Sequence, residues 1–170
     1  MISVLLDTSF FIRLLNSEDP LHENAKGYYK YFLEEEIKMK ISTISIAEYC
    51  VKGDITDLPL KNLMILPFNY DHGQKAGAFA KTIYEIRNKE KLVITPRILI
   101  PNDTKLFAQA DVESSIDAYV SSDAESAKIY AILRNHCGGT LLSNNDSDGY
   151  SKIDFCILTR KKQCGVAHCS

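Results

Sequence analysis

The sequence has little net charge and lacks an apolar run long enough to span a membrane. Its formal net charge is −2 and its isoelectric point is about 6.1, so any contact with phosphates must come from a local basic patch and not from the field of the whole protein. The apolar stretch 1–15 carries Asp7 and Arg13. It has neither a basic start nor a small-residue cleavage site, and is a poor signal peptide. We therefore expect a soluble cytoplasmic protein with no membrane segment.

Cysteine is too unevenly placed for a disulfide scaffold. The chain has five cysteines, an odd number, and four of them lie after residue 136. This pattern favours a reducing compartment. The group Cys164, His168 and Cys169 could bind a metal ion, but no Cys-x-x-Cys pair completes a set of four ligands. A plain loop is the simpler interpretation of these residues.

The composition is that of an ordinary globular domain. Hydrophobic residues make up 45% of the chain and charged residues 25%, a balance that allows a real core. A length of 170 residues fits one compact domain. We find no internal repeat and no interdomain linker.

Short apolar runs alternate with segments of helical spacing. Residues 2–6 are continuously apolar, which is typical of a strand buried on both faces. Further strands are expected at 40–43, 64–67, 116–120 and 153–159, and helices at 10–15, 22–36, 46–52, 70–88, 102–113 and 124–135. Thr8 or Ser9 would cap the first helix and Asn102 the fifth. The alternation predicts an α/β architecture with a parallel sheet wrapped by helices.

Four acidic residues fall where they can meet at one edge of such a sheet. Asp7 ends the first strand and Asp123 follows the fourth. Glu48 lies in the helix after the second strand, and Asp103 in the first turn of the fifth helix. Sites in parallel α/β sheets form beyond the carboxyl ends of the strands, so these four acids can converge. Asp7 is the strongest candidate, because a carboxylate that ends a buried strand is costly unless it is paired or binds a cation.

A cluster of carboxylates without His or Cys suits Mg²⁺ or Mn²⁺. Such ions hydrolyse phosphodiesters by activating water and neutralising charge on the scissile phosphate. Each acid alone has an ordinary structural explanation, because the chain has 22 acidic residues. Asp103 suits a helix N-terminus and Asp123 can cap the next helix. It is the conjunction of the four that favours a metal site.

Four segments resemble, in order, the four motifs of the PIN-domain nucleases. They are LLDTSFFIRLL at 5–15, STISIAEY at 42–49, IPNDTKLFAQA at 100–110 and AYVSSD at 118–123. They look most like the toxin ribonucleases of bacterial and archaeal type II toxin–antitoxin modules. The resemblance implies a PIN-like nuclease domain at 1–135, with 136–170 as a C-terminal extension that completes or flanks it.

The resemblance also implies a three-layer α/β/α fold with a mainly parallel central sheet, and the activity of a metal-dependent endoribonuclease. Matched by motif, the catalytic residues and ligands of Mg²⁺ or Mn²⁺ are Asp7, Glu48, Asp103 and Asp123. Glu48 would complete the metal shell directly or through water. In the fourth motif Ser121 stands where threonine is usual, and it retains the hydroxyl. An RNA substrate, an antitoxin protein and a homodimer are implied as partners.

Two alternative functions stay open. Haloacid-dehalogenase-like phosphatases also place an Asp after the first strand, but they need another Asp two residues on, where this chain has Ser9. A non-catalytic PIN-like module could instead bind RNA or protein. The presence of all four acids argues against that second alternative.

Other polar residues are weaker candidates. Asp111 lies eight residues after Asp103 and is either an extra ligand or, more simply, a solvated acid at the helix end. Asp146 and Asp148 imitate a calcium loop without its terminal Glu. The basic residues that could hold phosphates are Arg13, Lys105, Arg160, Lys161 and Lys162.

Histidines and hydroxyls complete the candidate residues. The histidines without a partner pattern, expected at the surface, are His22, His72 and His136. Three hydroxyl residues flank the acids: Thr8, Ser9 and Ser121. We expect them to position carboxylates and backbone and not to act as nucleophiles, because no His base lies in their sequence context.

Overall fold

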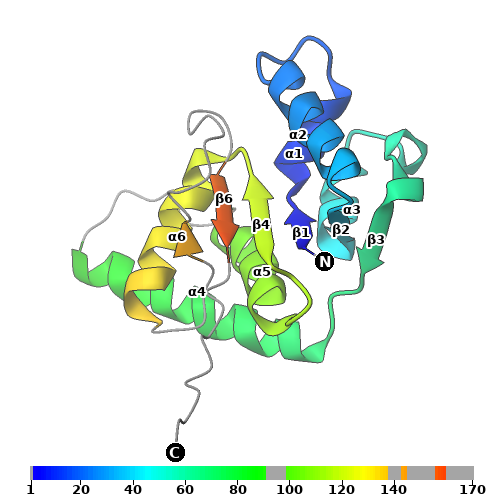
Figure 1. Cartoon of the computed structure of the whole chain (residues 1–170). Coiled ribbons are helices and arrows are strands. Elements are labelled where there is room, and N and C mark those ends of the chain that lie inside the picture. Colours follow the sequence, from blue (N-terminus) through cyan, green and yellow to red (C-terminus); the bar gives the residue numbers. More distant parts are fainter. Residues whose placement is uncertain (1, 91–98, 138–142, 145–155, 160–170) are drawn as a thin grey trace, which may run out of the picture.

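The computed structural model describes residues 2–90, 99–137, 143–144 and 156–159 (Figure 1). The strands are β1 (Ser3–Leu6), β2 (Lys38–Ser42), β3 (Leu63–Leu66), β4 (Ala118–Ser121), β5 (Ser143–Asn144) and β6 (Cys156–Thr159). The α-helices are α1 (Thr8–Leu15), α2 (His22–Glu34), α3 (Thr43–Tyr49), α4 (Tyr70–Glu90), α5 (Leu99–Val112) and α6 (Ala124–His136). Two short 3₁₀ helices, η1 (Ile55–Asp57) and η2 (Leu60–Asn62), precede β3.

The strands form one sheet in the order β3-β2-β1-β4-β6-β5. Within this sheet, β2 pairs in parallel with β3 and β1, and β1 pairs in parallel with β4. Strand β6 runs antiparallel to β4 and to β5. Leu6, near the end of β1, pairs with Ile41 on one side and Val120 on the other. The parallel strands therefore end at one common edge of the sheet. The predicted α/β class with a mainly parallel sheet is confirmed.

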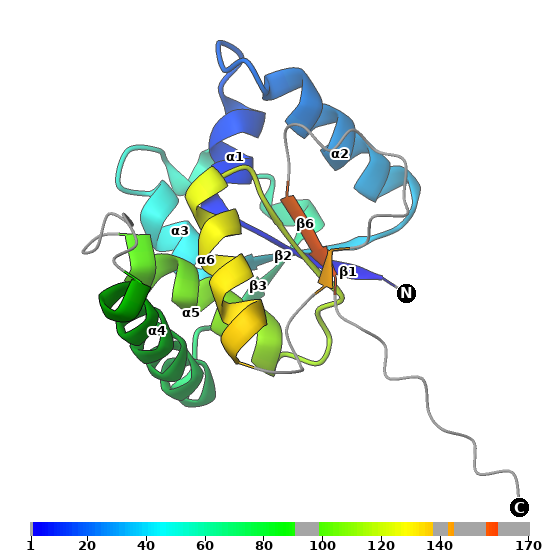
Figure 2. The same cartoon turned by 90° about the vertical axis from the view of Figure 1, so that its left-hand side faces the viewer.

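Helices cover both faces of the sheet, and β1 lies between them. All four residues of β1 are buried. Val4 and Leu6 pack with α1 and α2 in one hydrophobic core, whereas Leu5 packs with α4, α5 and α6 in the other. Figure 2 shows α1 and α2 on the opposite side of the strands from α4 and α5. This three-layer arrangement explains the continuous apolar run, because successive side chains of a strand point to opposite faces.

Helix starts differ from the sequence prediction at three places, and each has a local cause. Asp7, and not Thr8 or Ser9, is the N-cap of α1, with its carboxylate accepting from the Thr8 N–H. Ser42 caps α3 through the Ile44 N–H, so that helix starts earlier than expected. The fifth helix, α5, begins at Leu99 and not after Asn102. Pro101 fits into its first turn because N–H groups there have no intrahelical partner.

No helix within the described ranges is long and apolar enough to cross a bilayer.

Candidate active site

Asp7 lies at the junction of β1, β4 and α1, where three hydrogen bonds hold its carboxylate. Its Oδ1 accepts from the Thr8 N–H at 2.7 Å. Its Oδ2 accepts from the Ser9 hydroxyl at 2.6 Å and from the Ser121 hydroxyl at 2.8 Å. The residue is only 6% exposed. The positioning role predicted for these hydroxyls is therefore observed.

Glu48 reaches the same region from α3, the helix that follows β2. Its Oε2 accepts a hydrogen bond of 2.5 Å from the Thr8 hydroxyl. Partial burial raises the pKa of Glu48, as does the charge of Asp7, while the Thr8 hydrogen bond and the charge of Lys105 oppose the rise. Thr8 thus links the first two acidic motifs, with its backbone on Asp7 and its side chain on Glu48.

Asp103 is held inside α5 and is 8% exposed. Its Oδ1 accepts a 3.2 Å hydrogen bond from the hydroxyl of Ser126 on α6. Its Oδ2 is buried and has no hydrogen-bond partner. Burial, followed by the charges of Asp7 and Asp123, raises the pKa of Asp103 to about 7. A carboxylate oxygen that is buried without a partner costs free energy.

Asp123 follows β4 and is half-buried. Its N–H donates to the Ser121 hydroxyl at 3.1 Å, and its carbonyl accepts from Ala127 in the first turn of α6. Ser121 therefore contacts both Asp7 and Asp123. This one hydroxyl joins the acids that end β1 and β4.

The four predicted acids lie near one another at the carboxyl edge of the parallel strands, but they do not form a ready-made set of metal ligands. The charges of Asp7, Asp123 and Glu48 all raise the pKa of Asp103, which requires them to lie near it. Within the described ranges, no three His, Cys, Asp or Glu side chains are already close enough to hold an ion between them. Carboxylates gathered at one edge of the sheet repel one another, and this repulsion contributes to the raised pKa of Asp103.

Two expectations about nearby charged residues are wrong. Asp111 is not solvated, because its side chain is 4% exposed and its Oδ2 pairs with Lys75 Nζ of α4 at 2.8 Å. His72 is not at the surface but buried, with Nδ1 accepting from the Asn69 N–H and Nε2 3.1 Å from Glu113 Oε1. Both residues serve the contact between α4 and α5, a tertiary relationship that no local pattern shows.

Of the basic residues, Arg13 contacts the loop after β4. Its Nε donates to the Ser122 hydroxyl at 2.6 Å and its Nη1 forms an ion pair with Asp19 at 2.9 Å. Lys105 is half-buried in α5, where its charge lowers the pKa of Glu48. The other candidates lie outside the described residues: Asp146, Asp148, Arg160, Lys161, Lys162, Cys164, His168 and Cys169.

Two buried residues beneath the carboxylates were not predicted from the sequence. Ser126, which donates to Asp103, lies three positions after Asp123 and so one helical turn further along α6. Tyr119 precedes Ser121 by two positions and so shares its face of β4. The periodicities of helix and strand could have pointed to both residues.

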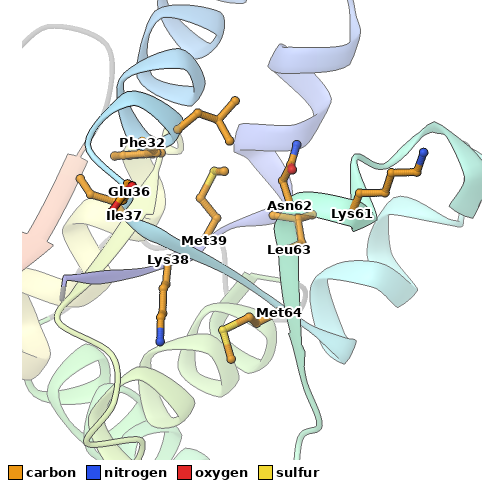
Figure 3. A pocket seen from close by; sticks show the side chains of 10 residues that line it. Phe32, Glu36, Ile37, Lys38, Met39, Lys61, Asn62, Leu63 and Met64 are labelled. Atoms are coloured by element: carbon orange, nitrogen blue, oxygen red, sulfur yellow. The ribbon is translucent and has the colours of Figure 1, made fainter.

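A pocket of about 250 Å³ lies elsewhere, between the end of α2 and the first residues of β2 and β3 (Figure 3). Most of its lining is apolar, including Phe32, Met39 and Leu63, and its one acid is Glu36. The carboxylate cluster is at the opposite ends of these strands. This pocket is therefore not the candidate active site.

The comparisons with known proteins show similarity of fold but find no close relative in sequence. No protein-family model matches the sequence, and no curated protein matches it significantly. The solved structure of VapBC2 from Rickettsia felis, bound to a DNA fragment from their promoter, is similar over 75% of this chain and 92% of that chain, with 19% identity and a TM-score of 0.50. At this identity the likeness shows the fold: VapC toxins are PIN-domain proteins, and the PIN-like fold is confirmed.

Two further solved structures are more distantly similar. VapC20 of Mycobacterium tuberculosis, described as a toxin that cleaves the sarcin–ricin loop, is 18% identical over 62% of this chain and 78% of that chain, with a TM-score of 0.41. DNA-bound VapBC from Salmonella typhimurium is 18% identical over 65% of this chain and 80% of that chain, with a TM-score of 0.41.

Proposed function

We propose that this protein is a divalent-metal-dependent endoribonuclease, and that it acts as the toxin of a toxin–antitoxin pair. The single observation that supports it most is Asp103, a buried acid whose Oδ2 has no partner and whose pKa is raised to about 7 beside Asp7 and Asp123. An isolated structural role does not account for a carboxylate kept in this environment. Three nearby acids and an oxygen-only donor set fit Mg²⁺ or Mn²⁺.

In this proposal Asp7, Asp103 and Asp123 hold the ion, and Glu48 completes the site directly or through water. A bound divalent ion would supply activated water and neutralise charge on the scissile phosphate. The hydroxyls of Ser9 and Ser121 keep Asp7 in place, and Thr8 keeps Glu48 in place. Residues that fix carboxylates in this way hold the reacting groups in one geometry, which lowers the barrier without further reorganisation.

The decisive experiment is cleavage of single-stranded RNA by Asp7→Asn. Asparagine is also a good N-cap, so α1 retains its start while the site loses one charged ligand. We expect cleavage by the wild type with Mg²⁺ or Mn²⁺, none with EDTA, and none by the variant. Asp71→Asn, at an exposed position of α4, is the matched control and should cleave normally.

Other outcomes of this experiment point to the alternatives. Full activity of folded Asp7→Asn would remove Asp7 from the site. A wild type that binds RNA but does not cleave it would be a non-catalytic module. Release of phosphate from a small phosphomonoester, without RNA cleavage, would indicate a phosphatase.

The toxin role is tested in cells. The fold shared with Rickettsia felis VapBC2 supports an antitoxin partner for this chain as well. We expect expression of the wild-type chain alone to arrest growth, and Asp103→Ala to relieve the arrest at equal soluble level. Normal growth with abundant wild-type protein would contradict the toxin role and leave the nuclease activity to the cleavage assay. The homodimer stays a prediction from the motifs.

A further inference from the structure

Tyr119 carries a buried hydroxyl directly beneath the carboxylates. The side chain is completely buried, and its hydroxyl has no hydrogen-bond partner. Burying a hydroxyl without a partner costs free energy that a phenylalanine at the same place would not. The fold therefore buries a polar atom that no hydrogen bond in the structure satisfies.

The strand register sets the position of Tyr119. It pairs with Leu5 across β1 and β4, and these residues precede Ser121 and Asp7 by two positions each. Side chains two apart on a strand share a face, so Tyr119 lies one step below the Ser121–Asp7 hydrogen bond. Its ring packs on Phe107, with the centroids 5.1 Å apart, and Phe107 lies one helical turn after Asp103 on α5.

The surrounding groups are those of the proposed site. Burial and the charges of Asp7 and Asp103 raise the pKa of Tyr119, whereas the hydroxyls of Ser126 and Ser121 act in the opposite direction. Tyr119 is thus near both acids and both serines. Ser121 already donates to Asp7 and accepts from Asp123. Ser126 donates its one hydrogen to Asp103 and keeps acceptor capacity free.

We propose that Tyr119 is a positioning residue for Asp103: its hydroxyl donates to Ser126 Oγ, which in turn donates to Asp103 Oδ1. The second hydrogen bond is present in the structure, and Ser126 is close enough to the Tyr119 hydroxyl to influence its pKa, which makes it the neighbour suited to accept the first. The chain of hydroxyls then fixes Asp103 with Oδ2 directed at the ion. This inference rests on the proposed metal-dependent function.

The test is the affinity for Mn²⁺ alone, measured from the free-ion electron paramagnetic resonance signal during titration of the folded proteins. Loss of a group that orients a metal ligand typically weakens binding 10–100-fold, and we expect Tyr119→Phe to weaken it about tenfold. Tyr130→Phe is the matched control, because Tyr130 is buried in the same core but lies one turn beyond Ser126 on α6. It should bind Mn²⁺ as the wild type does.

A double-mutant cycle tests the connection itself. Ser126→Ala should weaken Mn²⁺ binding, and adding Tyr119→Phe to it should weaken binding no further, since both changes break one chain. Additive losses would overturn the connection through Ser126.

The melting temperature in EDTA separates positioning from folding. Tyr119→Phe should melt at or above the wild-type temperature, because the hydroxyl it removes has no partner in the apo protein. A clearly lower melting temperature would mean that the hydroxyl serves the fold, and would overturn the inference.

The proposed function is checked in the same titration. Wild-type affinity in Tyr119→Phe, with loss of binding in Asp103→Asn, would overturn the role of Tyr119 alone. Wild-type affinity in Asp103→Asn, or no binding by the wild type, would overturn the metal site and the role of Tyr119 with it.

Discussion

Ser121 Oγ donates a 2.8 Å hydrogen bond to Asp7 Oδ2, and so joins the carboxyl ends of β4 and β1. The two residues are 114 positions apart in the chain. Both are buried, so the bond is shielded from water. The fourth motif therefore contacts the Asp7 carboxylate through the Ser121 hydroxyl, which also accepts from the Asp123 N–H.

Ser121→Ala tests this bond. A hydrogen bond to a charged group contributes about 1.5–3 kcal/mol, and the substitution also leaves the Asp123 N–H without its acceptor. We expect the free energy of unfolding to fall by about 2 kcal/mol in a urea titration. Ser17→Ala, at an exposed loop position, is the control. Equal effects of the two substitutions would contradict the structural role of Ser121.

The stability of the metal-free protein should decrease as the pH rises from about 4 to about 7. The pKa of Asp103 is raised from 3.8 to about 7, so within this range the native state retains a proton that the unfolded chain releases. A native state that binds more protons loses stability with rising pH, here by an amount on the order of a few kcal/mol. The raised pKa of Glu48 acts in the same direction.

The measurement is a series of urea midpoints in EDTA between pH 4 and 8. Asp103→Asn should flatten the decrease and should be at least as stable as the wild type above pH 7. The exposed Asp71→Asn should follow the wild-type curve. An Asp103→Asn curve parallel to that of the wild type would show that Asp103 does not titrate in this range.

Mn²⁺ should reverse the order of stability. Ligand at a hundred times its dissociation constant stabilises the native state by about 2.7 kcal/mol. For a chain of this size that corresponds to a rise in melting temperature of roughly 5–10 °C. We expect this rise for the wild type and a much smaller one for Asp103→Asn in melting curves with excess Mn²⁺. Equal rises in both proteins, or none in either, would mean that these acids do not bind the ion together.

Glu36→Gly should stabilise the fold without touching the site. Glu36 follows α2 with a φ of 52°, the left-handed region that favours glycine. The Ile37 N–H donates to the Phe32 carbonyl, and the Glu36 N–H donates to the Leu33 carbonyl. These are the hydrogen bonds of a Schellman motif, which usually has glycine at the position of Glu36. The residue borders the pocket at the end of α2 (Figure 3).

Since the left-handed conformation costs a side-chain-bearing residue about 1–2 kcal/mol, the glycine variant should gain roughly 1 kcal/mol in urea unfolding. Glu35→Gly is the control, because Glu35 has a φ of −88° and gains nothing from glycine. Stabilisation of both variants, or of neither, would contradict this explanation.

Local sequence was enough to predict most of the helices and strands and to single out the four candidate acids. The continuous apolar run of β1 predicts burial on both faces, and an acid directly after it predicts a group at the carboxyl edge of the sheet. Asp7, Glu48, Asp103 and Asp123 were predicted as the candidate site in this way, together with the motif resemblance. The start of α5 was misplaced because Pro101 resembles a break, although a first turn accepts proline.

Tertiary structure alone decided which distant groups share hydrogen bonds. Whether Asp111 faces water or Lys75, and whether His72 is exposed or lies against Glu113, depends on how α4 packs on α5. The orphaned Asp103 Oδ2 and the unpartnered Tyr119 hydroxyl likewise result from the register of β1 with β4 and the packing of α5 and α6. Periodicity and capping are set by neighbours a few residues apart, whereas burial and pKa are set by every element that packs against a group.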